Sequence, residues 1–216
     1  MRKTGIALIV LGTLLMAGAL FLFLQNKDES KDVAEVCDVV TQEIKDKIKT
    51  VIDQPITVPT PTEHVNPYNE EQVLRSYEMR VVDIDGNGYI GYISIPSIEV
   101  ELPVISEYSY PKLRIAPCRM LGSTKSGDLI ICGHNIESIF GRLGELTPGD
   151  VAYFTDMDGE TRRYIVTGTE VIGLTDAAAL KSGEWDMTVF TCTYGGGRRI
   201  VVRFVEVPDG YEISNR

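Results

Sequence analysis

The stretch from Thr188 to Arg203, T-V-F-T-C-T-Y-G-G-G-R-R-I-V-V-R, contains two β-type runs joined by a glycine-rich turn. The first run ends at Cys192, and Arg199 opens the second. Glycines accept the backbone angles that a tight turn needs, so this turn can bring the ends of the two runs together. The sequence therefore predicts paired strands that hold a thiol and a guanidinium within reach of each other.

A histidine in a similar setting supplies a third polar group. The run D-L-I-I-C-G-H-N, residues 128–135, ends an apolar strand at His134. The other histidine, His64, lies in a proline-rich stretch, so chemistry that needs an imidazole must use His134. A thiol becomes a nucleophile when a base or a cation lies nearby. Cys192, His134 and Arg199 are thus candidate catalytic residues for acyl transfer, although Cys192 taken alone also fits an inert buried thiol.

The composition argues against several classes of protein. The formal net charge of −10 and the absence of a basic patch make nucleic acid an unfavourable partner. A structural zinc site needs about four ligands, usually with a close cysteine pair, and the chain has no such pair. There is no G-x-S-x-G serine elbow either. We expect no cofactor, and Cys118 and Cys132 either pair or remain buried thiols.

The N-terminal region predicts a membrane anchor. Residues 5–24 form a run of 20 residues without a charge, which as a helix would span about 30 Å. Arg2 and Lys3 precede this run, so the positive-inside rule places residues 1–4 in the cytoplasm and the rest of the chain outside. A cleaved signal peptide is the alternative.

The rest of the chain divides into a stalk and one domain. Residues 25–67 are expected to hold a helix over residues 30–53, either a stalk or packed on the domain, and a proline-rich linker over residues 55–67. Residues 68–216 form the predicted domain. From Tyr89 onward many short apolar runs alternate with turn signals, which is typical of a closed or nearly closed β-barrel.

One segment resembles the start of a calcium-binding loop. In D-I-D-G-N-G-Y-I, residues 83–90, Asp83, Asp85 and Asn87 fit the first three ligand positions of an EF-hand. The twelfth position is Ser94 instead of glutamate, and β-type pattern follows instead of a helix. We interpret the segment as a turn rich in Asx and glycine, with these three residues as a weak calcium candidate.

Several segments in order resemble the sortase family, the membrane-anchored cysteine transpeptidases of Gram-positive bacteria. They are residues 91–104 (G-Y-I-S-I-P-S-I-E-V-E-L-P-V), 116–123 (A-P-C-R-M-L-G-S), 127–135 (G-D-L-I-I-C-G-H-N), 140–151 (F-G-R-L-G-E-L-T-P-G-D-V), 188–192 (T-V-F-T-C) and 199–202 (R-I-V-V). The signature T-L-x-T-C is matched with Val189 in place of leucine. The resemblance spans about residues 89–207.

This resemblance implies a mostly β fold, an eight-stranded sortase-like barrel with short helices, preceded by a single transmembrane helix. It implies that Cys192 is the nucleophile, His134 the general acid and base, and Arg199 the stabiliser of the oxyanion. Arg198 is the alternative to Arg199, which is preferred because it directly precedes the apolar run. The class stays open, with class B-like and class D-like members both considered.

The implied activity is cleavage of an LPXTG-like sorting signal through a thioacyl intermediate, followed by joining to an amine. The partners would be surface proteins with a C-terminal sorting signal, and an amine from a peptidoglycan precursor or a pilin lysine. The location would be the cell membrane, with the catalytic domain extracellular. Thr191, Asn135 and Trp185 are the candidate substrate-binding residues. The alternatives are an extracellular cysteine peptidase that releases its substrate by hydrolysis and a non-catalytic surface binding module.

Overall fold

The computed structural model describes residues 2–53, 77–181 and 183–208. The strands are β1 (Val82–Ile84), β2 (Asn87–Ile95), β3 (Val100–Ile105), β4 (Cys118–Leu121), β5 (Leu129–Cys132), β6 (Val151–Asp156), β7 (Thr161–Gly173), β8 (Met187–Cys192) and β9 (Arg198–Glu206). The helices are α1 (Arg2–Asp53), α3 (Tyr110–Leu113) and α4 (Ala177–Lys181), with 3-10 turns η1 (Pro96–Ile98) and η2 (Leu143–Glu145). The predicted proline-rich linker, with His64, lies outside the described residues.

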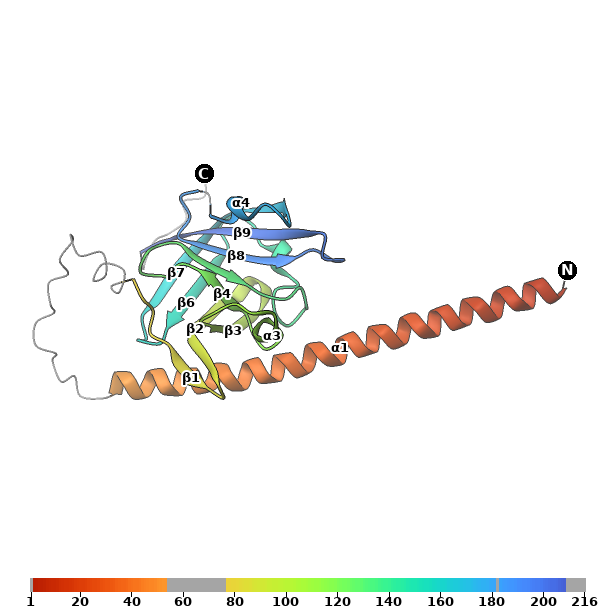
Figure 1. Cartoon of the computed structure of the whole chain (residues 1–216), viewed down its shortest axis with the longest axis horizontal. Helices are drawn as coiled ribbons and strands as arrows, with labels where there is room; N and C mark the ends of the chain where they lie inside the picture. The colour runs from red at the N-terminus through yellow and green to blue at the C-terminus, as the bar shows by residue number, and fades with distance from the viewer. Residues whose placement is uncertain (1, 54–76, 182, 209–216) are drawn as a thin grey trace, which may run out of the picture.

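Within the described residues, eight strands close into a barrel (Figure 1). Their order is β2-β3-β4-β5-β8-β9-β7-β6, and β6 pairs back with β2. β1 adds a hairpin to the outside of this ring. The pairs β3–β4 and β5–β8 are parallel and the other pairs are antiparallel. Closure removes the open sheet edges that would otherwise leave backbone groups unpaired. The predicted eight-stranded barrel with short helices is confirmed.

The barrel encloses a core of large apolar side chains drawn from most of its strands. Tyr89 on β2, Phe154 on β6, Tyr164 on β7 and Phe204 on β9 are all buried. Successive residues of a strand point to opposite faces, so one face of each strand supplies this core. β5 and β8 are buried on both faces along nearly their whole length, and the candidate site lies where they end.

The N-terminal helix is continuous, whereas the sequence suggested an anchor and a separate helix. α1 runs from Arg2 to Asp53, and the predicted anchor over residues 5–24 falls in its N-terminal half. The C-terminal half packs against β2 and β3 through the buried residues Cys37, Val40, Ile44 and Ile48. Their spacing of three or four residues produces one apolar stripe. Of the two alternatives for this region, the helix packed on the domain is the one observed (Figure 1).

The described part of the chain includes no helix that combines the length and the mean hydropathy of a membrane span.

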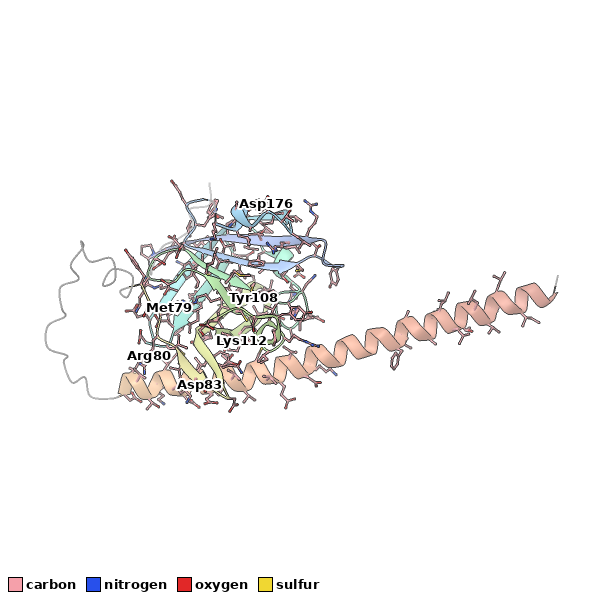
Figure 2. The ribbon with its side chains drawn as sticks, viewed as in Figure 1. Met79, Arg80, Asp83, Tyr108, Lys112 and Asp176 are labelled. Atoms are coloured by element: carbon pink, nitrogen blue, oxygen red, sulfur yellow. The ribbon has the colours of Figure 1, made fainter. Side chains whose placement is uncertain are left out.

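The segment with the calcium-like pattern forms the β1–β2 hairpin, where Figure 2 labels Asp83. Asp85 and Gly86 occupy the turn with φ of 51° and 78°, as a two-residue hairpin of the I′ kind requires. The backbone N–H of Gly86 donates to Oδ1 of Asp83 at 3.1 Å. Residues 83–90 therefore contain the turn that their Asx and glycine residues indicated. Among the described residues, no group of three or more His, Cys, Asp or Glu side chains is arranged to hold a metal ion.

Candidate active site

Cys192 and Arg199 lie directly opposite each other at the turn end of the β8–β9 hairpin. They are partners in the antiparallel register, and the ladder closes with the N–H of Thr193 donating to the carbonyl of Arg198 at 2.8 Å. Gly195 and Gly196 carry the turn with positive φ of 81° and 70°. Directly opposed residues point to the same face of a sheet, with Cβ atoms about 5 Å apart. The predicted pairing of thiol and guanidinium at the strand ends is therefore observed.

The two neighbouring arginines point to opposite faces, because side chains alternate along a strand. The guanidinium of Arg198 is exposed, and its Nη2 donates to the carbonyl of Val171 at 3.0 Å. The Cζ of Arg199 lies 5.3 Å from the centroid of the Phe190 ring, a cation–π contact that restrains the guanidinium. Arg199 is thus the arginine that shares a face with Cys192.

His134 reaches the same end of the sheet from β5. This strand runs parallel to β8, with Cys132 opposite Phe190, and the N–H of Gly133 donates to the carbonyl of Phe190 at 3.1 Å. Two residues further along each chain, His134 is level with Cys192. The parallel register therefore brings the base and the thiol to the same end of two adjacent strands.

Close packing fixes the turn that carries His134. A Cβ on Gly133 would lie 2.4 Å from Cδ2 of Phe140 and 2.9 Å from Cγ2 of Ile139, so only glycine fits there. The N–H of Phe140 donates to the carbonyl of His134 at 3.2 Å. The ring of Tyr110 meets the imidazole edge-on, with centroids 6.1 Å apart and planes at 85°. The imidazole is therefore bounded by an aromatic ring on the side of α3.

Two tyrosines before and within α3 were not anticipated from the sequence. Figure 2 labels Tyr108 in the segment between β3 and α3. The pKa of Tyr108 is raised, first by burial and then by the thiols of Cys132, Cys118 and Cys192, while Arg199 acts in the opposite direction. Tyr108 lies two residues before Tyr110, whose ring contacts His134. The signal in the sequence was the pair of aromatics in E-Y-S-Y, residues 107–110, within an otherwise polar segment.

Cys192 is the exposed thiol among the four cysteines, all of which are free. Cys118 and Cys132 face each other across β4 and β5 without a disulfide, and the Cys132 thiol donates to the carbonyl of Cys118 at 3.5 Å. Burial raises the pKa of Cys118 to about 11 and that of Cys132 to about 12. Of the two alternatives for this pair, buried thiols are observed.

A cavity of about 420 Å³ opens on the same face as Cys192, further back along β8. Its floor includes Ile130 on β5 and Thr188 on β8, and its wall includes Leu180 on α4 and Trp185. Thr188 precedes Cys192 by four residues, a distance of about 13 Å along a strand. Trp185, a candidate substrate-binding residue, therefore lines this cavity.

The other two candidate substrate-binding residues differ in character. Thr191 is 1% exposed, and its Oγ1 donates to the carbonyl of Gly133 at 2.9 Å. Its hydroxyl ties β8 to the turn before His134 and is not presented to solvent. The Oδ1 of Asn135 is buried and has no hydrogen-bond partner among the described residues. A buried acceptor without a partner is costly, so this oxygen is an unsatisfied group next to His134.

A model of the sortase domain family matches residues 93–207, more than half of the chain. The chain belongs to the sortase family. Sortase A of Bacillus anthracis is 27% identical over 124 residues, which are 53% of this chain and 57% of that protein. The chain therefore spans little more than half the length of this relative. The expected family is confirmed.

Solved structures of sortases share the fold. Sortase C1 from Streptococcus agalactiae is 28% identical with a TM-score of 0.52, over 78% of this chain and 90% of that chain. The Clostridium perfringens Sortase D5 transpeptidase is 21% identical with a TM-score of 0.56, over 81% and 99%. A lid mutant of sortase A from Corynebacterium diphtheriae is 22% identical with a TM-score of 0.50, over 79% and 95%. Since these sortases are named A, C and D, the class of this chain is not resolved.

Proposed function

We propose that this sortase is a membrane-anchored cysteine transpeptidase that cleaves an LPXTG-like sorting signal and joins the new carboxyl end to an amine. The observation that carries the proposal is the placement of Cys192, His134 and Arg199 at three neighbouring strand ends. A thiol, a base and a fixed cation on one face are the groups that acyl transfer through a cysteine requires. A non-catalytic binding module would not need all three together.

The chemistry proceeds in two acyl transfers. In the first, the Cys192 thiolate attacks the carbonyl carbon of the scissile peptide bond, and Arg199 donates hydrogen bonds to the oxyanion. His134 gives a proton to the leaving amine as the C–N bond breaks, which leaves a thioester on Cys192. In the second, an incoming amine loses a proton to His134 and attacks the thioester, which restores the thiolate.

The cavity beside Trp185 suits the upstream part of such a signal. An extended peptide advances about 3.3 Å per residue, so four residues cover the roughly 13 Å between Thr188 and Cys192. With its scissile carbonyl at Cys192, the peptide would place the residue three or four positions upstream in the cavity. The unpartnered Oδ1 of Asn135 is a candidate acceptor for a peptide N–H.

We propose that residues 5–24 are a signal anchor, with residues 1–4 cytoplasmic, residues 25–67 the packed helix end and the linker, and residues 68–216 the extracellular catalytic domain. The 20 residues carry no charge and follow Arg2 and Lys3. Large apolar side chains along this part of α1, such as Leu14 and Phe21, are exposed rather than packed on the barrel. Protease digestion of intact spheroplasts should remove the domain and leave a membrane-bound N-terminal fragment.

The function is tested with the full-length protein in detergent and a panel of LPXTG-like peptides, with and without oligoglycine. Mass spectrometry would follow the thioacyl adduct and the ligated product, with Cys192→Ala as the control. A transpeptidase gives both species, and the variant gives neither. Adducts that only hydrolyse, even with other amines such as lysine peptides present, would favour the peptidase. Absence of any adduct with a reactive Cys192 would contradict the proposal.

A further inference from the structure

The helix in the wall of the cavity beside Trp185, α4, is too short to be stable by itself. α4 has five residues, Ala177–Lys181, of which Leu180 is the buried one. A single helical turn is unstable in water, because nucleation fixes several residues for few hydrogen bonds. The last carbonyls of any helix also lack partners within it. Something outside α4 must therefore hold it in place.

Arg203 on β9 supplies that support. Its Nη1 donates to the carbonyl of Leu180 at 3.1 Å and to Oγ1 of Thr188 at 3.0 Å. Its Nη2 donates to the carbonyl of Ala179 and, at 2.7 Å, to Oε1 of Glu170, which also accepts from Nε at 2.9 Å. The guanidinium thus caps the C-terminal end of α4, which lies beside β9 in Figure 1.

The burial of Arg203 indicates a specific role. It is 4% exposed, in the middle of the apolar run from Ile200 to Val205. A buried charge is costly unless its donors are paired, and a cation is favoured at the negative end of a helix. The planar fork of arginine can bond two carbonyls, a hydroxyl and a carboxylate at once, which the ammonium of lysine cannot.

Two partners of Arg203 are themselves parts of the cavity. Leu180 belongs to its wall and Thr188 to its floor. The guanidinium of Arg203 therefore connects the wall of the cavity to its floor. Arg203 lies opposite Thr188 in the β8–β9 register, four residues from Arg199 and so about 13 Å from the reacting atoms. It can shape the cavity without touching the chemistry.

We propose that Arg203 is a positioning residue for substrate recognition, which holds α4 against β8 so that the cavity keeps the shape that binds the upstream part of the peptide. The inference rests on the proposed transpeptidase function. Since the contacts lie away from Cys192, loss of Arg203 changes KM and leaves kcat nearly unchanged. A residue that served only the stability of the barrel would not produce this split.

The test uses full-length Arg203→Met and Arg203→Lys, with Arg162→Met as the matched control. Arg162 pairs with Glu160 and Glu206 at 3.2 and 3.1 Å, and neither lines the cavity. Three measurements are made on each variant: KM and kcat for the best sorting peptide, amide hydrogen exchange, and the rate of Cys192 alkylation by iodoacetamide. The alkylation rate reports the thiol without using the cavity.

Arg203→Met should raise KM about tenfold with kcat within about twofold, and exchange should quicken at residues 177–185. Arg203→Lys keeps the charge but loses the fork, so an increase of about threefold in KM is expected. If Arg203→Met fails to fold, the KM of Arg203→Lys provides the test. Glu170→Gln should change KM less than twofold, because the carboxylate is half exposed and the two carbonyl bonds remain. Arg162→Met and the alkylation rates should match the wild type.

A KM that stays unchanged in a folded Arg203 variant, or a fall confined to kcat, overturns the inference while the proposed function stands. A wild-type protein that forms no adduct with any peptide overturns the proposed function, and the role of Arg203 in recognition falls with it. Hydrogen exchange that quickens throughout the barrel instead of at residues 177–185 assigns Arg203 to overall stability.

Discussion

The ring of Tyr110 contacts the imidazole of His134 edge-on, with planes at 85° and centroids 6.1 Å apart. Such aromatic pairs contribute about 0.5–1.5 kcal/mol, enough to bias the orientation of a half-buried imidazole. Tyr110 is itself 64% exposed and belongs to α3, so it restrains His134 from an element outside the sheet.

We predict that Tyr110→Ala lowers kcat/KM for acyl transfer about 3- to 10-fold, whereas Tyr110→Phe, which keeps the ring, changes it less than twofold. The pH profile of kcat/KM checks that the effect acts on the ionising pair of Cys192 and His134, because a change in substrate binding alone would not displace a limb of the profile. Equal losses in the two variants would show that the hydroxyl, not the ring, is the important group.

Because Arg199 shares a face with Cys192 and Arg198 does not, we predict that substitutions of the two arginines affect acyl transfer differently. Arg199→Ala should lower kcat by about 10²–10³, the usual effect of removing an oxyanion donor. Arg198→Ala should cost less than about threefold, since Arg198 donates to the carbonyl of Val171 on the other face. Single-turnover formation of the thioester, followed by mass spectrometry, measures both. The larger loss in Arg198→Ala would reverse the assignment.

Thr191 is predicted to position the strand end instead of contacting substrate. Thr191→Val removes the donor to the carbonyl of Gly133 and should lower the free energy of unfolding by about 1–2 kcal/mol. KM should stay unchanged, and Thr191→Ser should restore stability. Urea unfolding and steady-state kinetics give the two readouts. A rise in KM without a loss of stability would return Thr191 to a substrate-binding role.

Gly133 is predicted to tolerate no side chain. In Gly133→Ala the new methyl would overlap the buried ring of Phe140, and overpacking of this kind costs about 1–3 kcal/mol. Acyl transfer should fall as well, because His134 follows directly. Gly168→Ala is the control, since a Cβ there meets nothing within 4 Å. Urea unfolding that gives the same stability for both alanine variants would contradict the prediction.

Three buried thiols predict a loss of stability at alkaline pH. Burial raises the pKa of Cys37 to about 12, of Cys118 to about 11 and of Cys132 to about 12, from an ordinary value of 9.0. Below pH 9 these thiols are protonated in both states, so stability is full. Above pH 9 these thiols ionise only in the unfolded chain. The free energy of unfolding therefore falls with rising pH until the pKa values of the folded state are reached.

The slope should approach about 1.4 kcal/mol per pH unit for each buried thiol that remains protonated in the folded state. Urea unfolding between pH 8 and pH 10.5 measures it. Cys37→Ala should reduce the slope by the contribution of one thiol. This change in slope is separate from any effect of the substitution on the free energy of unfolding at pH 8. A slope equal in Cys37→Ala and wild type would exclude Cys37 as a source.

Much of the catalytic face was predictable from local pattern. β8 and β9 follow the two apolar runs on either side of the glycine turn, and the single turn between them leaves one way to pair. The expected turn within residues 83–90 likewise has two residues and joins β1 to β2. In both places the relevant contacts are close in sequence, so propensity and turn chemistry determine them.

The role of Arg203 was not predictable, because its partners come from β7, β8 and α4. A charge within an apolar run was the signal, but its meaning depends on where a short helix docks. The continuity of α1 and its packing on β3 were undecided for the same reason. An apolar stripe indicates that a helix is covered, and it does not say by what.

Local sequence was enough to predict the strand ends that carry Cys192, His134 and Arg199, since runs of apolar residues and glycine turns act through near neighbours. The three-dimensional packing was needed to show that Thr191 bonds the turn before His134 and that Arg203 bonds α4 in the cavity wall. These relationships depend on barrel closure, which brings distant segments into one register and selects one face of each strand for the core.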